Sequence, residues 1–449
     1  MRIRMSDLEA VLRRAPVLGV VVLLAGVLGG CAGGPLRPGF QSPPATPTPP
    51  ASPPQTPTPP PKPTLPTEPT WTPPPTKGPI TPTPVALCAF GPPAPPEPGP
   101  SLEAYVFSEP SVVLTHTSGI AIVGWLPDGQ NLLITRFIIP SRRGTTESIR
   151  IFNVIEGTEK GYGEWGGFSV GFDPKPVWLS AISAVAFADR VANQQIGLYI
   201  AQGGALPRLV VTDLTSYFIA ASPTGDRVVF FAESAKGQPE IYNASQEQVQ
   251  ALPYQLPFTQ RVGAGVYQAV WHPDGNRIAF YSNAGFYLAD MNTGQICEID
   301  LGIEGGRKRW AVSAQWSPNG HYLATLTTVG EPIVPFIDLT LIDMGTGERH
   351  HLNLGHQYLG IITWSPNSRD LLVVAKPPAQ VAGLDSLYIV NANTLGSRRM
   401  LSDYPFILTG GWGAAWSPSG REIALACPTI DPTGTTREGR LCIISIEVK

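Results

Sequence analysis

The sequence predicts an all-β fold, a seven-bladed β-propeller, preceded by a signal peptide and a disordered linker rich in Pro and Thr. Three observations predict this fold. A tryptophan-turn motif recurs about every fifty residues, short apolar runs follow each copy, and 28 of the 50 prolines fall between Pro35 and Pro100. We expect the signal peptide over residues 1–30, the linker over 31–100 and the propeller over 101–449.

The first thirty residues have the pattern of an export signal. Arginines at positions 2, 4, 13 and 14 precede the apolar run PVLGVVVLLAGVL, which is short for a bilayer span. A retained anchor helix is the alternative. The stretch Leu28-Gly29-Gly30-Cys31 resembles the lipobox of bacterial lipoproteins, whose cysteine thiol receives a diacylglyceryl group. The resemblance implies lipidation of Cys31 and an exported chain anchored to a bacterial membrane, facing the periplasm or the cell exterior.

Residues 31–100 contain text such as TPTPPASPPQTPTPPPKPT. Such a segment has too little apolar surface to offset the entropy of ordering, and proline lacks the N–H that a helix or sheet needs. We expect an extended polyproline II stalk of up to roughly 200 Å, at about 3.1 Å per residue. A docking tract for aromatic-lined grooves is the alternative interpretation.

The repeats justify the propeller. Their steps are 53, 43, 50, 45, 48 and 52 residues, which suit one four-stranded blade per repeat and do not suit helical repeats. Six blades would need one very long insertion between the first and third copies, so seven is preferred. Aligned on the tryptophan, the copies begin at Trp125, Trp178, Ala221, Trp271, Trp316, Trp364 and Trp416.

Five of the seven copies have both Pro and Gly, the residues of a tight turn. In strings such as WSPNG, Pro sets the backbone angle of the second turn position and Gly accepts a left-handed conformation. The tryptophan should end the inner strand of a blade and fill the space between blades. Ala221 stands where the other copies have Trp, and we expect a looser junction there.

A second recurring pattern sets the order of strands within a blade. YLADMNTGQ and TLIDMGTGE place Asp after a strand and Gly a few residues later, as a hairpin to an outer strand requires. The chain ends before the last blade has an outer strand, whereas Ser111 to Thr115 form an apolar run with no blade of their own. We therefore expect this N-terminal strand to complete the last blade and close the ring.

The motif W-S-P-[DNS]-G in series resembles the TolB-like propeller repeat, a relative of the WD-repeat family, over residues 101 to 449. The resemblance implies the fold more firmly than a partner. TolB itself has six blades and a separate α/β domain, and the sequence shows no counterpart of that domain.

The sequence contains no convincing catalytic centre. Gly167 to Gly171 fits G-x-S-x-G around Ser169, but the required α/β strand and helix are not predicted there. The six histidines fall on opposite faces of the predicted ring, so we expect neither a metal nor another cofactor. A net charge of -3 gives no basic excess for nucleic acid. We expect a monomer that is not an enzyme.

We expect ligand binding on the face where outer-to-inner connections gather around the channel. Aromatic rings beside cations suit a protein or polysaccharide of the cell envelope. The alternative function is an enzyme that degrades polysaccharide or peptide in the channel. A cluster of His and acidic side chains at the channel mouth would favour the enzyme. The candidate binding residues are Arg142, Arg143, Trp165, Arg307, Lys308, Arg309, Trp310, Tyr358 and Trp412.

The cysteines fit an oxidising compartment. Besides Cys31 there are four, an even number. Cys427 ends one predicted strand and Cys442 begins the next, so a disulfide between them is expected. Cys88 could pair with Cys297, or both could be free thiols.

Overall fold

The computed structural model describes the main part of the chain between residues 87 and 449. The described ranges are 87–89, 99–117, 119–141, 144–166, 175–191, 195–232, 234–235, 238–254, 256, 268–282, 285–329, 338–352, 358–376, 386–402, 413–427, 429–430 and 436–449. The expected signal peptide, Cys31 and most of the expected linker lie outside them. In the described ranges the only helix is a single 3-10 turn, η1 (Leu102–Ala104), and no helix is long and apolar enough to cross a membrane.

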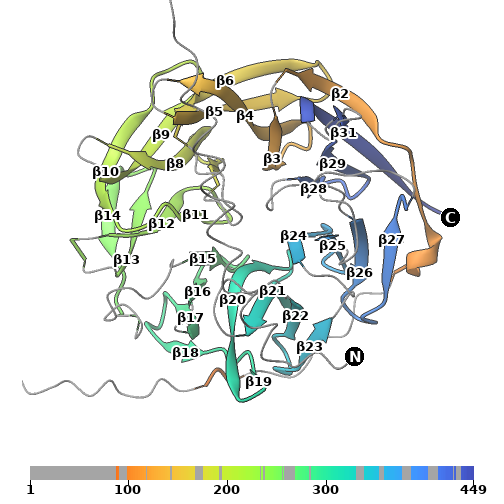
Figure 1. Ribbon diagram of the computed structural model, residues 1–449. Helices are drawn as coiled ribbons and strands as arrows, with labels where there is room; N and C mark the ends of the chain where they lie inside the picture. Colours follow the sequence, from red (N-terminus) through yellow and green to blue (C-terminus); the bar gives the residue numbers. More distant parts are fainter. Residues whose placement is uncertain are drawn as a thin grey trace, which may run out of the picture. The chain divides into compact units, whose positions relative to one another are not determined.

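Seven antiparallel sheets surround a central axis, which confirms the predicted seven-bladed propeller (Figure 1). Each sheet runs from an inner strand near the axis to an outer strand, in the predicted order. Blades 1 to 3 contain β3 (Ile120–Trp125), β4 (Asn131–Ser141), β5 (Gly144–Asn153) and β6 (Thr158–Trp165); β7 (Val177–Leu179), β8 (Ala184–Arg190), β9 (Ile196–Gln202) and β10 (Arg208–Leu214); and β11 (Ala220–Ala221), β12 (Arg227–Phe231), β13 (Pro239–Asn243) and β14 (Gln248–Ala251).

Blades 4 to 6 repeat this arrangement, and blade 5 has an additional hairpin strand. They contain β15 (Gln268–Trp271), β16 (Arg277–Ser282), β17 (Gly285–Asp290) and β18 (Ile296–Glu298); β19 (Ile303–Glu304), β20 (Arg307–Trp316), β21 (Tyr322–Val329), β22 (Asp338–Asp343) and β23 (Arg349–Leu352); and β24 (Tyr358–Trp364), β25 (Asp370–Lys376), β26 (Ser386–Asn391) and β27 (Ser397–Met400).

Both ends of the chain build blade 7, as predicted. Its strands are β28 (Ala414–Trp416), β29 (Glu422–Ala426), β30 (Thr429–Ile430), β31 (Thr436–Val448), β2 (Ser111–His116) and β1 (Tyr105–Phe107). The C-terminal strand β31 pairs with β29 on one side and with β1 and β2 on the other. The ring is therefore closed by main-chain hydrogen bonds between segments more than 300 residues apart, which also covers an edge of the last sheet.

The inner turns have the geometry that their sequences predict. In blade 5 the Gly320 N–H donates to the Ser317 carbonyl at 2.8 Å, and Gly320 has a φ of 73°. In blade 6 Ser368 takes this place with a φ of 62°, a conformation that favours glycine. The Ser365 hydroxyl accepts a hydrogen bond from the Asp370 N–H at 2.9 Å, as the Ser317 hydroxyl does from the Tyr322 N–H in blade 5.

The core lies between the blades. Seven clusters of buried apolar residues each join two neighbouring blades, and together they fill all seven junctions. Trp271, Trp316, Trp364 and Trp416 are each 5–7% exposed within them. The predicted role of the motif tryptophan as filler between blades is confirmed at these positions.

Two disulfides occur in the described residues. Cys427 is bonded to Cys442, and Cys88 is bonded to Cys297 of β18. The Cys88 N–H also donates to the Glu298 carbonyl at 3.0 Å, and Leu87 forms a parallel bridge with Glu298. The segment before the propeller is thus attached to the outer edge of blade 4.

Candidate functional site

The motif tryptophans connect neighbouring blades through hydrogen bonds at the inner strands. Three indole N–H groups donate at 3.1 Å to a backbone carbonyl on the inner strand of the preceding blade. Each accepting residue comes just before the motif position of its own blade. In each case the bond provides a hydrogen-bond donor for a carbonyl on the channel-facing edge of an inner strand. The pairs are Trp125 with Ala415, Trp271 with Ala220, and Trp364 with Gln315.

Trp416 of blade 7 differs from these three. Its indole N–H donates to the Gly420 carbonyl of its own turn, at 3.1 Å, and makes no such bond to blade 6. The junction between blades 6 and 7 therefore lacks a bond that three other junctions have. Two cavities meet at this place, and both are lined by Trp416 and Pro366.

The first cavity lies in the central channel, at the end where the Pro-containing turns gather, and has a volume of about 420 Å³. Trp125, Trp364 and Trp416 line it together with the prolines of three turns. Its polar lining comes from Gln315, Thr363 and Lys175. This channel end is aromatic, has one cation, and has no histidine or carboxylate among its described lining residues.

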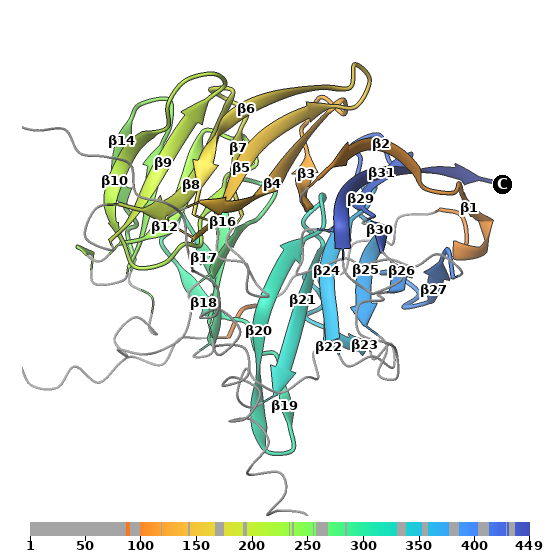
Figure 2. The same cartoon turned by 45° about the horizontal axis from the view of Figure 1, so that its top comes forward.

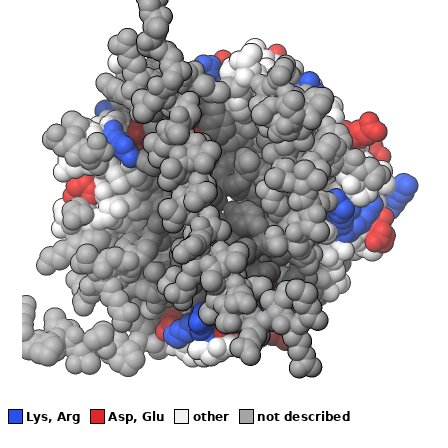
Figure 3. Space-filling model, in the orientation of Figure 1, with Lys and Arg blue, Asp and Glu red and all other residues white. Residues whose placement is uncertain are grey.

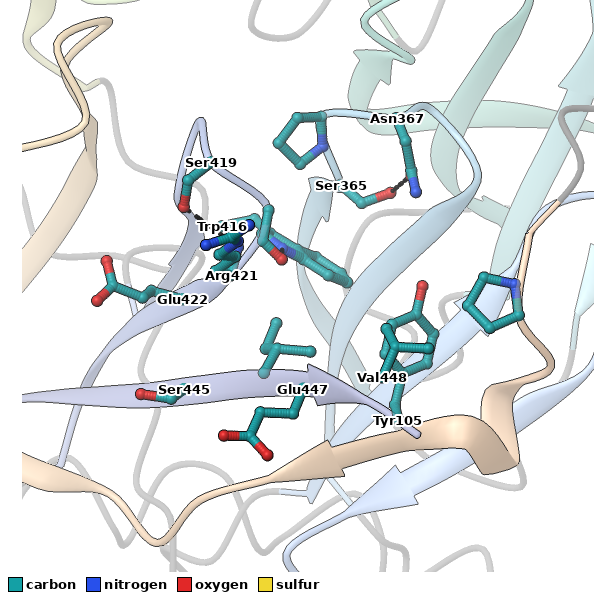
Figure 4. A pocket seen from close by; sticks show the side chains of 14 residues that line it. Tyr105, Ser365, Asn367, Trp416, Ser419, Arg421, Glu422, Ser445, Glu447 and Val448 are labelled. Carbon is teal, nitrogen blue, oxygen red and sulfur yellow. Dashed lines mark hydrogen bonds between the residues drawn. The ribbon is translucent and has the colours of Figure 1, made fainter.

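The second cavity lies between blades 6 and 7 and has a volume of about 880 Å³ (Figure 4). Trp416 and Tyr105 lie across it, and Asn367 reaches it from the blade 6 turn. Its lining also includes Arg421 at the blade 7 turn. This volume is within the usual range of small-molecule sites, roughly 300–1,000 Å³. We call the two adjoining cavities the junction site.

A buried ion pair holds Tyr105, one of the residues that line the junction site. Arg369 and Asp370 are bonded at 2.9 Å, and their side chains are 2% and 0% exposed. The Tyr105 hydroxyl donates to Asp370 Oδ2 at 2.6 Å and accepts from Arg369 Nη2 at 2.5 Å. Burial, followed by the hydrogen bond to Asp370, raises the pKa of Tyr105, so its hydroxyl remains a donor at neutral pH. Asn391 Nδ2 donates to Asp370 Oδ1 and completes the network.

The structure does not gather the described candidate binding residues into one site. Trp165 ends β6 in the core, is 2% exposed and packs against Phe187 of blade 2. It is therefore not available to a surface ligand. The side chain of Tyr358 is outside the described part of the structure. Three further candidates, Arg142, Arg143 and Trp412, are also outside it.

The four candidates of blade 5 occupy one hairpin, β19–β20, which extends beyond the neighbouring strands (Figure 2). Arg309 is held by Glu304 and Asp338, and its side chain is only 7% exposed. Trp310 packs against the core between blades 5 and 6. Lys308 is exposed and contacts Glu298 at 3.3 Å, and Arg307 is exposed. Among the described candidates, only Arg307 and Lys308 are accessible cations.

On the face shown in Figure 3, the visible Lys, Arg, Asp and Glu side chains of described residues lie toward the periphery. Within the described ranges no group of three or more His, Cys, Asp or Glu side chains could hold a metal ion. His272 is an example of a histidine with a structural role, because it is 4% exposed and its ring meets Trp316 edge to face. Burial, followed by the charge of Arg277, lowers the pKa of His272.

Sequence reasoning predicted a binding face at the other end of the channel and did not consider the junction site. One local signal was present. Blade 6 reads PNSRD where its neighbours read PNGHY and PSGRE, so Ser368 replaces glycine and Asp370 begins a buried strand. A buried carboxylate requires a partner. One partner of Asp370, Arg369, is adjacent in sequence, whereas the other, Tyr105, is 265 residues away.

The fold and the site together define a seven-bladed β-propeller with a solvent-accessible site at one interblade junction. The fold expected from the TolB-like repeat is therefore the fold observed. No protein-family model matches the chain. A curated relative, dipeptidyl-peptidase 5 of Porphyromonas gingivalis, is 23% identical over 165 residues, which are 34% of this chain and 23% of the relative. The chain thus spans about a quarter of that relative.

Solved structures similar to the chain include two TolB proteins and a lyase. TolB from Acinetobacter baumannii is 18% identical, with a TM-score of 0.40 and 64% of each chain covered. The putative TolB from Agrobacterium tumefaciens is 16% identical, with a TM-score of 0.39 over 54% of this chain and 83% of its own. Oligogalacturonate lyase from Vibrio parahaemolyticus is 12% identical, with a TM-score of 0.50 over 76% of this chain and 96% of its own. The last likeness concerns the propeller fold alone.

Proposed function

We propose that this chain is a membrane-anchored, exported lipoprotein whose propeller is a binding module for a protein or polysaccharide of the cell envelope, and that it is not an enzyme. The observation that carries the proposal is the composition of the channel end. Trp125, Trp364, Trp416 and Lys175 line it, and no histidine or carboxylate is among its described lining residues. Acid–base or metal chemistry needs such groups, whereas aromatic walls with a few polar side chains suit binding.

A capture experiment tests the proposed binding function. The full chain is immobilised and exposed to solubilised cell envelope. The retained material is compared between the wild-type protein and two charge-reversal variants. Lys175→Glu changes the channel end, whereas Lys308→Glu makes the same change on the exposed hairpin of blade 5. We expect Lys175→Glu to reduce retention several-fold and Lys308→Glu to leave it unchanged. Equal retention by all three proteins would contradict binding at the channel end.

Labelling tests the lipid anchor separately. Cells that express the chain are supplied with a radioactive fatty acid, and the chain is then isolated. The thiol of Cys31 is the proposed acceptor, in the context Leu28-Gly29-Gly30-Cys31. We expect label in the wild-type chain and none in Cys31→Ser. Label that persists in the variant would place the lipid elsewhere.

A further inference from the structure

We propose that the junction site binds a neutral oligosaccharide, that is, a short sugar chain without carboxylate or sulfate groups. This inference depends on the proposed binding function and names the ligand class and its place. The two cavities have volumes of about 420 Å³ and 880 Å³ and share Trp416 and Pro366. The second cavity alone is near the upper end of the roughly 300–1,000 Å³ that is usual for small-molecule sites. A ligand that also contacts the first cavity is therefore longer than one sugar unit.

The charges of the junction site select against an acidic polymer. Lys175 and Arg421 contribute two cations to the lining, and Glu422 and Glu447 contribute two anions. The described lining is therefore electrically balanced. An acidic sugar chain would gain no net attraction from it, and on the blade 7 side it would meet two carboxylates and one cation, Arg421. A neutral ligand has no such penalty.

The hydrogen-bonding groups of the site match sugar hydroxyls. Gln315, Thr363, Asn367 and Ser445 line the cavities, and amide and hydroxyl side chains both donate and accept hydrogen bonds. A sugar hydroxyl also does both.

Asn367 provides a defined contact. Its Oδ1 is used within the turn, where it accepts from the Ser365 hydroxyl at 2.5 Å and from the Arg369 N–H at 3.2 Å. Figure 4 shows the Asn367 amide on the cavity side of the turn, with its nitrogen directed away from the backbone of that turn. Asn367 Nδ2 is therefore placed to donate to a ligand oxygen.

The strand beside the cavity argues against a peptide bound by main-chain pairing. An extended peptide gains affinity by adding to an open strand edge. β31 already pairs with β1 on one side, and on the other the Ile446 N–H donates to the Arg421 carbonyl at 2.7 Å. Trp416 and Tyr105 line the second cavity, with 7% and 5% of their surfaces exposed, and the buried Arg369–Asp370 pair holds Tyr105 in place. Such a rigid site needs little ordering on binding.

The test compares two matched asparagines. Asn367→Asp keeps the turn acceptor and replaces the amide donor with a charged acceptor. Asp occupies the same turn position at Asp128 and Asp274, so the fold tolerates it. Asn319→Asp makes the same change in the blade 5 turn, where Asn319 Oδ1 contacts the Ser317 hydroxyl at 2.8 Å and the residue lines neither cavity.

The full chain in detergent is titrated calorimetrically with tetrasaccharides of β-linked glucose, α-linked glucose and N-acetylglucosamine, and with tetragalacturonate. We expect at least one neutral tetrasaccharide to bind and tetragalacturonate not to bind. Asn367→Asp should weaken the neutral ligand by about tenfold or more, since one hydrogen bond is lost and a carboxylate is introduced, and Asn319→Asp should change affinity less than about twofold.

Three results would overturn the inference: no binding of any neutral tetrasaccharide, tighter binding of tetragalacturonate, or equal weakening by Asn367→Asp and Asn319→Asp. Retention of an envelope protein that depends on Lys175, without sugar binding, would also overturn it. That last result would leave the proposed binding function standing, so the two failures are distinguishable.

Discussion

Tyr105→Phe should destabilise the propeller, because the lost hydroxyl connects the N-terminal strand to the buried ion pair of blade 6. Tyr105 is 5% exposed and lies on β1, which pairs with the C-terminal strand. Its hydroxyl donates to Asp370 Oδ2 at 2.6 Å and accepts from Arg369 Nη2 at 2.5 Å. The substitution removes both bonds while keeping the aromatic ring and its packing.

The size of the effect follows from burial and charge. A hydrogen bond to a charged group contributes about 1.5–3 kcal/mol. Arg369 Nη2 keeps its 2.9 Å bond to Asp370 Oδ2, so neither ion is left without a partner. The cost is therefore below the sum of two such bonds. We expect the free energy of unfolding to fall by about 2–3 kcal/mol.

Urea unfolding followed by tryptophan fluorescence measures this change, and Tyr254→Phe is the matched control. Tyr254 is 8% exposed, and its hydroxyl has no hydrogen-bond partner among the described atoms. Removing that hydroxyl should be neutral or stabilise by about 1 kcal/mol. If Tyr105→Phe proves no more destabilising than Tyr254→Phe, the network does not support closure as argued.

Three further predictions concern single contacts. Trp364→Phe removes the indole bond to Gln315 and should lower the free energy of unfolding by about 1–2 kcal/mol, measured by urea titration. Burial lowers the pKa of His272, so its contribution to stability is present above the unfolded pKa of about 6.5 and is lost as the pH falls below that value. His272→Ser should therefore make the free energy of unfolding depend less on pH below about 6.5. An unchanged slope of the free energy of unfolding against pH would contradict this. Replacing Cys88 and Cys297 together with Ser should lower the free energy of unfolding by about 2–5 kcal/mol, and equal urea midpoints for wild type and variant would show that the disulfide constrains little.

The turn motif made the ring predictable, because its information is local. Pro and Gly at fixed offsets specify a turn whatever lies around them, and Gly320 adopts the expected left-handed angle. Seven copies of the motif, five of them with both Pro and Gly, gave the number of blades. The run beginning at Ser111 could be assigned to the last blade because it is apolar and had no other partner.

The junction site could not be predicted, because it depends on contacts between distant segments. Tyr105 belongs to a three-residue strand with no repeat pattern, and its partner Asp370 sits where the neighbouring motif copies have Tyr322 and Glu422. The orientation of the Trp416 indole is also a matter of packing, since its local sequence AWSPSG matches that of the other copies. No window of sequence contains both halves of these contacts.

Closure and the junction site have a common physical origin. Blade 7 is assembled from both ends of the chain, and β1 adds Tyr105 to the side of this blade that faces blade 6. There the ring of Tyr105 lies beside the turn of blade 6, and Trp416 bonds within its own turn instead of reaching the neighbouring inner strand. The hydrogen bonds of Tyr105 with Arg369 and Asp370 therefore connect blades 6 and 7 next to the cavity that lies between these blades. A propeller closed without β1 would lack that support, so the segment that completes the ring also shapes the cavity in which we place the ligand.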